Sequence, residues 1–180
     1  NLPDRTRNTY SSRLTMTTAA SLLDMCGNVF AEDGSFKDCV GEYYSALCEV
    51  RAFCTDSEYT RSTDKGDITY GFYESDRLPD RLIRICCDLT RLIGKYIRDG
   101  HDYADVLEPV YRELKKTVFA SSFFDENFRL FASRANDDLT VQILCLDPSG
   151  ILERMLGAAK SSILFSATLS PIDYFCEVTG

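Results

Sequence analysis

Six basic side chains recur through one stretch of the sequence at intervals typical of one face of a helix. They are Arg77, Arg81, Arg84, Arg91, Lys95 and Arg98, separated by four, three, seven, four and three residues. At about 100° per residue, these positions fall within roughly one third of the circumference of a helix. This row, which we call the basic stripe, has the chemistry to contact the phosphates of a nucleic acid, which positions a strand without reading its bases.

The basic stripe has a second interpretation, which the sequence leaves open. The chain has 28 acidic and 20 basic residues, a net charge of -8, and this balance argues against bulk electrostatic binding to nucleic acid. The stripe is therefore either a local phosphate-binding surface or a solvated helix face that pairs with Asp and Glu elsewhere. Asp88 interrupts the row.

The eight cysteines could form disulfides or bind a metal, but their spacing does not support either role. The sequence has no Cys-x-x-Cys pair and a single histidine, His101, whereas a zinc site usually needs close pairs of ligands. Most of the cysteines occupy apolar positions of amphipathic segments, where a free cysteine behaves as a small hydrophobe. We therefore expect reduced cysteines, no metal site and a cytoplasmic protein.

Four segments have the apolar periodicity of helices, and one of them carries the basic stripe. In each segment apolar residues recur three and four positions apart, as expected where helix packs against helix. The segments are residues 19–30, 36–54, 78–96 and 103–118. In the third segment, an apolar row of Leu82, Ile85, Leu89 and Tyr96 lies on the other side of the helix from the stripe.

The rest of the chain has other patterns. Residues 55–67 are polar and rich in turn formers, which predicts a long loop, and residues 68–73 fit a short strand. Residues 127–146 alternate between apolar and polar positions around an Asn/Asp-rich turn, which predicts a β-hairpin. Residues 147–175 have the pattern of a helix–strand–helix tail. The predicted fold class is therefore mainly α, with an antiparallel helical body over residues 13–120.

Three stretches of the sequence resemble motifs of the XPD/DinG helicases of superfamily 2. The run 162–175, SILFSATLSPIDYF, is similar to motif III of that family, in which a buried strand leads into Ser-Ala-Thr and Leu-Ser-Pro. Upstream, Cys145-Leu146-Asp147-Pro148-Ser149 is similar to the family's Cys-Leu-Asp-Pro-Ser run. Asn1-Leu2, with the basic and polar residues after it, resembles the segment directly after the family's Asp-Glu-Ala-His motif. The order of these runs makes the resemblance more specific than a lone Ser-Ala-Thr triplet would be.

The resemblance implies an organisation and a function for the chain. Residues 1–12 would be a remnant of the first motor domain, residues 13–139 the helical arch domain, and residues 140–180 the return to the motor domain with motif III. The fold class becomes an antiparallel helical arch domain with a β-hairpin and a short α/β tail. The chain would be an internal fragment of an ATP-dependent DNA helicase of DNA repair or replication, in which the arch encloses the single-stranded DNA path.

The resemblance also assigns site residues. In motif III, Ser166, Ala167 and Thr168 would couple ATP hydrolysis to DNA movement; the alternative is a strand-to-helix turn whose hydroxyls are satisfied locally. The sequence has no Gly-x-x-x-x-Gly-Lys-[Ser/Thr] phosphate loop and no Asp-Glu-Ala-His run, so we expect no catalytic residue here and no ATP hydrolysis by the chain alone. ATP and Mg²⁺ would be bound by other parts of the longer parent protein. Whether the parent also has an iron–sulfur cluster, ligated upstream of this chain, is a question that the sequence leaves open.

Two classes of function remain. One is part of a DNA motor, with single-stranded DNA and repair proteins as partners of the parent. The other is a helical protein-interaction module without DNA affinity. A membrane partner is not expected, because no apolar run approaches the roughly 18 residues that a membrane span needs, and the polar start does not have the pattern of a signal peptide. A salt-dependent affinity for single-stranded DNA would favour the first class over the second.

Overall fold

Helices and strands are interspersed along the chain, several of them in consecutive pairs of one kind. The computed structural model describes residues 2–28, 34–64, 66–100, 104–161, 173 and 176. Their helices are α1 (Leu2–Tyr10), α2 (Met16–Asn28), α3 (Gly34–Phe53), the 3-10 helix η1 (Cys54–Ser57), α4 (Asp80–Arg98), α5 (Ala104–Ser121) and α6 (Ser149–Gly157). The strands are β1 (Ser12–Thr15), β2 (Tyr59–Thr63), β3 (Gly66–Ser75), β4 (Phe128–Ala135) and β5 (Asp138–Cys145).

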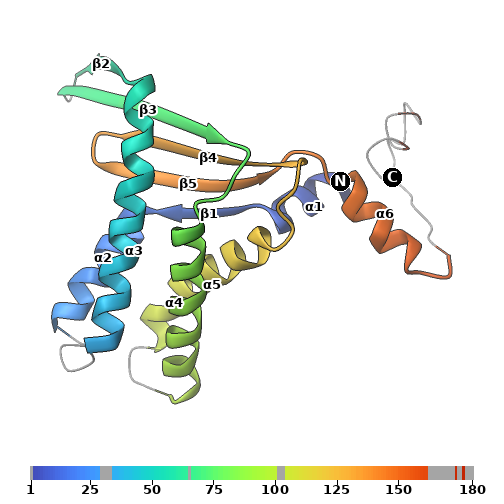
Figure 1. The fold of residues 1–180 in the computed structure, drawn as a ribbon, viewed down its shortest axis with the longest axis horizontal. Helices are drawn as coiled ribbons and strands as arrows, with labels where there is room; N and C mark the ends of the chain where they lie inside the picture. The colour runs from blue at the N-terminus through green and yellow to red at the C-terminus, as the bar shows by residue number, and fades with distance from the viewer. Residues whose placement is uncertain are drawn as a thin grey trace.

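The strands form one antiparallel sheet in the order β1-β5-β4-β3-β2 (Figure 1). The β4–β5 hairpin lies at its centre, with a register that runs from Phe128 opposite Cys145 to Ala135 opposite Asp138. Its turn contains Asn136, whose φ of 53° lies in the left-handed region that asparagine tolerates. The hairpin predicted over residues 127–146 is therefore confirmed.

α2, α3, α4 and α5 gather on one side of this sheet, whereas α1 and α6 lie at its end (Figure 1). α2, α3 and α5 contact strands of the sheet, whereas α4 packs between α3 and α5. Along β5 the burial alternates, with Val141 and Ile143 buried and Gln142 between them only half-buried. This period of two is that of a strand with one face packed on a core.

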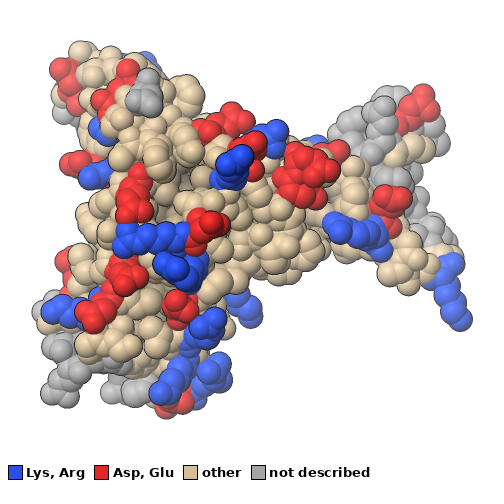
Figure 2. Space-filling view, in the orientation of Figure 1, with Lys and Arg blue, Asp and Glu red and all other residues tan. Residues whose placement is uncertain are grey.

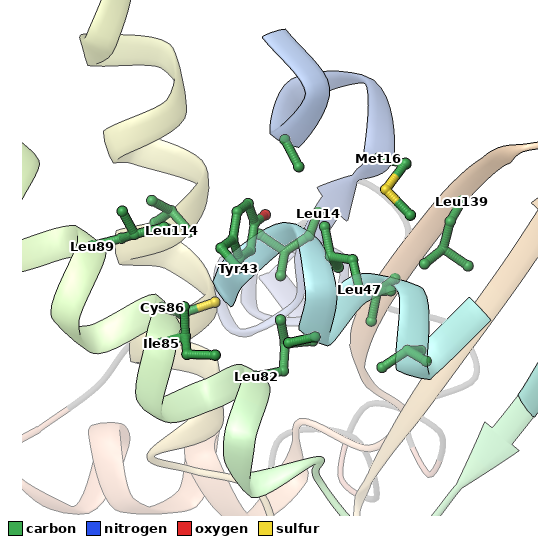
Figure 3. Packing of buried hydrophobic residues seen from close by; sticks show 14 of the residues in the cluster. Leu14, Met16, Tyr43, Leu47, Leu82, Ile85, Cys86, Leu89, Leu114 and Leu139 are labelled. Atoms are coloured by element: carbon green, nitrogen blue, oxygen red, sulfur yellow. The ribbon is translucent and has the colours of Figure 1, made fainter. Parts of the chain in front are cut away.

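The core lies where α2, α3, α4 and α5 pack together against the sheet, and Figure 3 shows its packing. Tyr43 and Leu47 of α3 lie among side chains from α2, α4, α5 and the strands. The labelled partners are Leu14, Met16, Leu82, Ile85, Cys86, Leu89, Leu114 and Leu139. All of these side chains are buried, and each buried aliphatic or aromatic side chain of this size contributes about 1.5–3 kcal/mol to folding.

The prediction of a mainly α fold, a helical arch with a hairpin and a short α/β tail, was wrong. Residues 2–161 contain a five-stranded antiparallel sheet as well as helices, so the fold is mixed α/β. β1 has four residues, too few to establish a period of two. β2 is exposed at every position, so it has no apolar alternation, and residues 55–67 were wrongly assigned to a loop.

Over their described residues, the four predicted helical segments are confirmed as α2, α3, α4 and α5. The short strand predicted at 68–73 is confirmed within the longer β3. α6 begins at Ser149, whose N–H donates to Oδ1 of Asp147 at 2.9 Å. The strand and second helix predicted after α6 lie outside the described residues, apart from Asp173 and Cys176. None of the described helices combines the length and hydropathy needed to cross a membrane.

Candidate nucleic-acid interface

The basic stripe lies on α4, which its apolar side holds in place. Leu82, Ile85 and Leu89 of the predicted apolar row are buried, and Tyr96 is partly buried against the same core. The predicted orientation of this helix, with its apolar row inward, is therefore confirmed. α4 also packs closely against α5 at Gly94. A Cβ atom added there would lie only 3.2 Å from the ring of Tyr111 on α5.

The stripe side chains reach the surface along the length of α4. Arg84, Arg91, Lys95 and Arg98 are exposed on the helix, Arg81 is half-buried, and Arg77 is exposed just before the helix begins. Figure 2 shows basic side chains along the position of α4, with acidic ones beside them. Lys95 and Arg98 fall in the last turn, where the negative end of the helix dipole favours cations.

Two members of the stripe form ion pairs with carboxylates. Arg81 pairs with Glu49 of α3, and Arg91 pairs with Asp88 of its own helix at 2.9 Å. The side chains of Arg91 and Asp88 are 78% and 47% exposed, so solvent screens their attraction and the pair adds little stability. The interpretation of a paired, solvated face therefore applies to these two arginines.

The other four cations have no ion-pair partner within the described ranges. They are Arg77, Arg84, Lys95 and Arg98. Exposed guanidinium and ammonium groups without an ion-pair partner keep their donors available for phosphate oxygens, which both groups bind in charge-assisted hydrogen bonds. The arrangement can therefore hold a phosphate backbone along one side of α4.

A pocket of about 370 Å³ opens at the start of the stripe, between α3, β3 and the first turn of α4. Arg77 and Arg81 line it together with apolar side chains such as Val50. The rings of Phe53 and Tyr73, which also line it, lie 5.0 Å apart between centroids. An apolar pocket with a few charged groups at its edge can take one aromatic or aliphatic group. Of the residues that line this pocket, the basic stripe had identified only Arg77 and Arg81.

A second set of residues could not be identified from the basic stripe or the helicase motifs. Tyr59, Tyr70, Phe72 and Phe131 form two stacked ring pairs on the side of the sheet away from the helices. The alternation of Tyr70 and Phe72 within the predicted strand 68–73 could have indicated that their rings lie on the same face of a sheet. The adjacent aromatic pairs Tyr43-Tyr44 and Phe123-Phe124, by contrast, pack in or against the core.

The Cys145–Ser149 run lies beside the N-terminal part of the chain. Arg7 of α1 donates from Nε to the carbonyl oxygen of Leu146 at 3.1 Å. The N–H of Cys145 donates to Oγ of Ser11 at 3.0 Å. The two described stretches that carry the resemblance, far apart in sequence, are thus in direct contact.

The cysteines that the structure describes form no disulfide. Burial raises the pKa of the Cys145 thiol to about 11, and burial with the charges of Asp88 and Glu42 raises the pKa of the Cys39 thiol to about 11. Such thiols are protonated at neutral pH and are poor nucleophiles and metal ligands. Among the described residues, no group of three or more His, Cys, Asp or Glu side chains could hold a metal ion.

The predicted coupling residues of motif III, Ser166, Ala167 and Thr168, lie outside the described residues. Of the run 162–175 that carries them, only Asp173 is described. Their role, and the division of the chain into residues 1–12, 13–139 and 140–180, stay predictions. No known protein-family model matches the chain.

Proposed function

We propose that the chain is part of an ATP-dependent DNA helicase and that α4 contacts the phosphates of single-stranded DNA. The observation that supports this best is the set of exposed cations on α4 that lack ion-pair partners in the described ranges: Arg84, Lys95 and Arg98. From Arg84 to Arg98 the helix rises about 21 Å, enough to meet several phosphates of one strand. The resemblance to motif III supports the same assignment from the sequence.

The stripe would act locally, against the charge of the whole chain. Each phosphate that Arg or Lys neutralises releases counterions, so such binding weakens as salt concentration rises. The net charge of -8 repels a nucleic acid backbone elsewhere on the surface. A strand would therefore lie along the stripe rather than coat the molecule, and the contacts would position it without selecting a sequence.

The parent protein would supply the ATP chemistry. The sequence has no phosphate loop and no Asp-Glu-Ala-His carboxylates, so ATP and Mg²⁺ would be held by other parts of the parent, as would an iron–sulfur cluster if it has one. Ser166, Ala167 and Thr168 would couple hydrolysis to DNA movement. The parent would work in the cytoplasm in DNA repair or replication, with repair proteins among its partners.

A triple substitution tests the phosphate contacts in the full-length parent. Arg84→Gln, Lys95→Gln and Arg98→Gln together remove charge while keeping helix propensity and the ion pairs of Arg81 and Arg91. Affinity for single-stranded DNA should fall. The slope of log affinity against log salt should flatten by about 2 units, because each contact to a single strand contributes about 0.7. Binding would be measured by fluorescence anisotropy of a labelled oligonucleotide over a range of salt concentrations.

A matched control removes the same charge from a neighbouring helix. Arg112→Gln, Lys115→Gln and Lys116→Gln lie on α5, where the three side chains are exposed. This variant should keep the wild-type salt slope. If the stripe variant also keeps it, with an unchanged melting temperature, the stripe is a solvated helix face and the proposal is wrong. If the stripe variant is destabilised, the cations have a structural role instead.

One observation favours a protein-interaction module as the second candidate function. The pocket beside Arg77 and Arg81 has apolar walls and the half-exposed ring of Phe53, so it could take an apolar side chain of a protein partner. This candidate predicts that neither the stripe variant nor the α5 control variant differs from the wild type in binding to single-stranded DNA, because none of the three binds it.

A further inference from the structure

One face of the sheet is left uncovered by the helices that the structure describes. On β4, Leu130 and Ala132 are buried toward the helices, whereas Phe131 between them is only half-buried. Residues directly opposite each other in an antiparallel sheet point to the same face, so the register identifies the other members of each face. Within the described strands, no side chain of this second face, which we call the open face, is fully buried.

Four aromatic rings form a row across the open face. Tyr59 of β2 stacks on Tyr70 of β3, with 5.3 Å between ring centroids and 21° between ring planes. Phe72 of β3 stacks on Phe131 of β4, with 6.5 Å and 19°. Tyr70 and Phe72 are two positions apart on one strand, so they lie on the same face about 6.7 Å apart. The row thus crosses three neighbouring strands.

These rings are accessible, and the backbone beneath them is held in place. Phe72 is 52% exposed and Tyr59 is 57% exposed. The N–H of Phe72 donates to Oγ of Ser57 at 2.8 Å, and the Ser57 hydroxyl donates to the Phe72 carbonyl oxygen, which ties β3 to η1. Cross-strand aromatic pairs stabilise sheets by packing. Packing between strands does not require rings that keep half of their surface in water. The exposed area of these rings is therefore available to a ligand.

The charges of the open face fit an anionic ligand. Its described strands present Arg13, Arg61 and Arg129 against the carboxylates Glu74 and Asp138. The described strands thus carry one positive charge in excess on this face, whereas the chain as a whole has a net charge of -8. Arg129 lies 3.7 Å from Glu74, whereas Arg61 is exposed and has no ion pair in the described ranges. Arginines beside exposed rings are typical of surfaces that bind single-stranded nucleic acid.

We propose that the open face binds single-stranded DNA by stacking bases on Tyr59, Tyr70, Phe72 and Phe131. Sheets with exposed aromatic rings bind single strands in this way, and the interaction tolerates any base because every base has a flat π-face. The inference rests on the proposed function for the identity of its ligand. It assigns a different surface and a different interaction, because the stripe on α4 holds phosphates whereas the open face holds bases.

A fluorescent reporter tests base stacking directly. The chain has no tryptophan, so Phe72→Trp places a single indole in the row and keeps an aromatic ring there. Titration with oligo(dT) should quench its emission, because a base stacked on the indole deactivates its excited state. Met155→Trp is the control, since Met155 is exposed on α6, which lies away from most of the sheet (Figure 1). The emission of the control should change little.

A second experiment separates bases from phosphates. Phe72→Leu and Phe131→Leu remove flat rings while keeping apolar contact between the strands, and far-UV circular dichroism checks the fold. Each variant would be titrated with oligo(dT) and with an abasic oligonucleotide of the same length. Loss of one stacking ring should weaken binding of oligo(dT) by about tenfold. Binding of the abasic oligonucleotide should stay as in the wild type.

The outcomes distinguish this inference from the proposed function. If the wild type binds both oligonucleotides equally well and the indole emission of the Phe72→Trp variant does not change, the open face takes no bases, although the phosphate contacts of α4 stand. If neither oligonucleotide binds at any salt concentration, the proposed function and this inference both fail. Normal oligo(dT) affinity in folded Phe72→Leu and Phe131→Leu variants would likewise overturn the stacking role.

Discussion

Glu113 is a half-buried carboxyl group on α5 that makes folding depend on pH. Among the described residues, its Oε2 atom is buried without a hydrogen-bond partner. Burial raises the pKa of Glu113 above its ordinary value, and this effect outweighs the opposing hydrogen bond from Thr18 and the charge of Arg13. The folded state therefore holds the Glu113 proton more tightly than the unfolded state does.

The sign of the effect comes from proton linkage. With a raised pKa in the folded state, the stability that protonated Glu113 contributes is complete below its unfolded pKa and is lost as pH rises through its folded pKa. Glu113→Gln should therefore melt at a higher temperature than the wild type near neutral pH, and the difference should vanish in acid. Thermal melts across this pH range would measure it. An equal melting-temperature difference at every pH would contradict the assignment.

The basic stripe shows what spacing can predict at the scale of single residues. Intervals of three and four placed its members on one helix face, and their exposure agrees with that placement. Spacing could not predict that Arg81 pairs with Glu49, because Glu49 belongs to α3 and reaches Arg81 through tertiary packing. The pair Asp88–Arg91 was visible in the sequence as two opposite charges three residues apart.

At the scale of elements, η1, which directly follows α3, lies tightly against β3. A Cβ at Gly71 would overlap the carbonyl oxygen of Cys54, which is backbone and cannot move aside easily. Glycine at this position is therefore what lets η1 approach the strand. The same approach brings Ser57 to the backbone of Phe72, so it also helps to form the edge of the open face.

Substitution of Gly71 should show the cost of losing this close approach. Gly71→Ala should lower the free energy of unfolding by about 1–3 kcal/mol, the usual range for overpacking. Gly41→Ala is the matched control, because a Cβ at Gly41 meets nothing within 4 Å in α3, and it should stabilise by up to about 1 kcal/mol. Urea unfolding would measure both variants. Equal effects of the two substitutions would mean that η1 and β3 can separate at no cost.

The elements that sequence patterns predicted are those with enough residues to show a period. α4 has its apolar and basic rows over 19 residues, and the β4–β5 hairpin alternates through two strands of 8 residues each. β1 joins the sheet through pairing with β5, more than 120 residues away in sequence. β2 is held by hydrogen bonds to β3 rather than by burial. Neither β1 nor β2 has a local apolar pattern in the sequence, so the five-stranded sheet could not be predicted.

At the scale of the whole molecule, the two proposed DNA-binding surfaces belong to different layers. The stripe lies on the helical layer, and the open face lies on the side of the sheet away from it. Because the chain has a net charge of -8, contacts outside these surfaces would repel a strand. We therefore expect binding that is confined to two places, phosphates at α4 and bases at the open face.

Photo-crosslinking would locate a bound strand on these two surfaces without any substitution in the protein. Single-stranded oligonucleotides that carry thiothymidine would be bound to the parent, irradiated, and the attached peptides identified by mass spectrometry. We expect crosslinks within and beside α4 and on β2, β3 and β4, with those at α4 declining most as salt rises. Crosslinks that avoid both surfaces, or that fall mainly on α2 and α6, would contradict the assignment of DNA to the stripe and the open face.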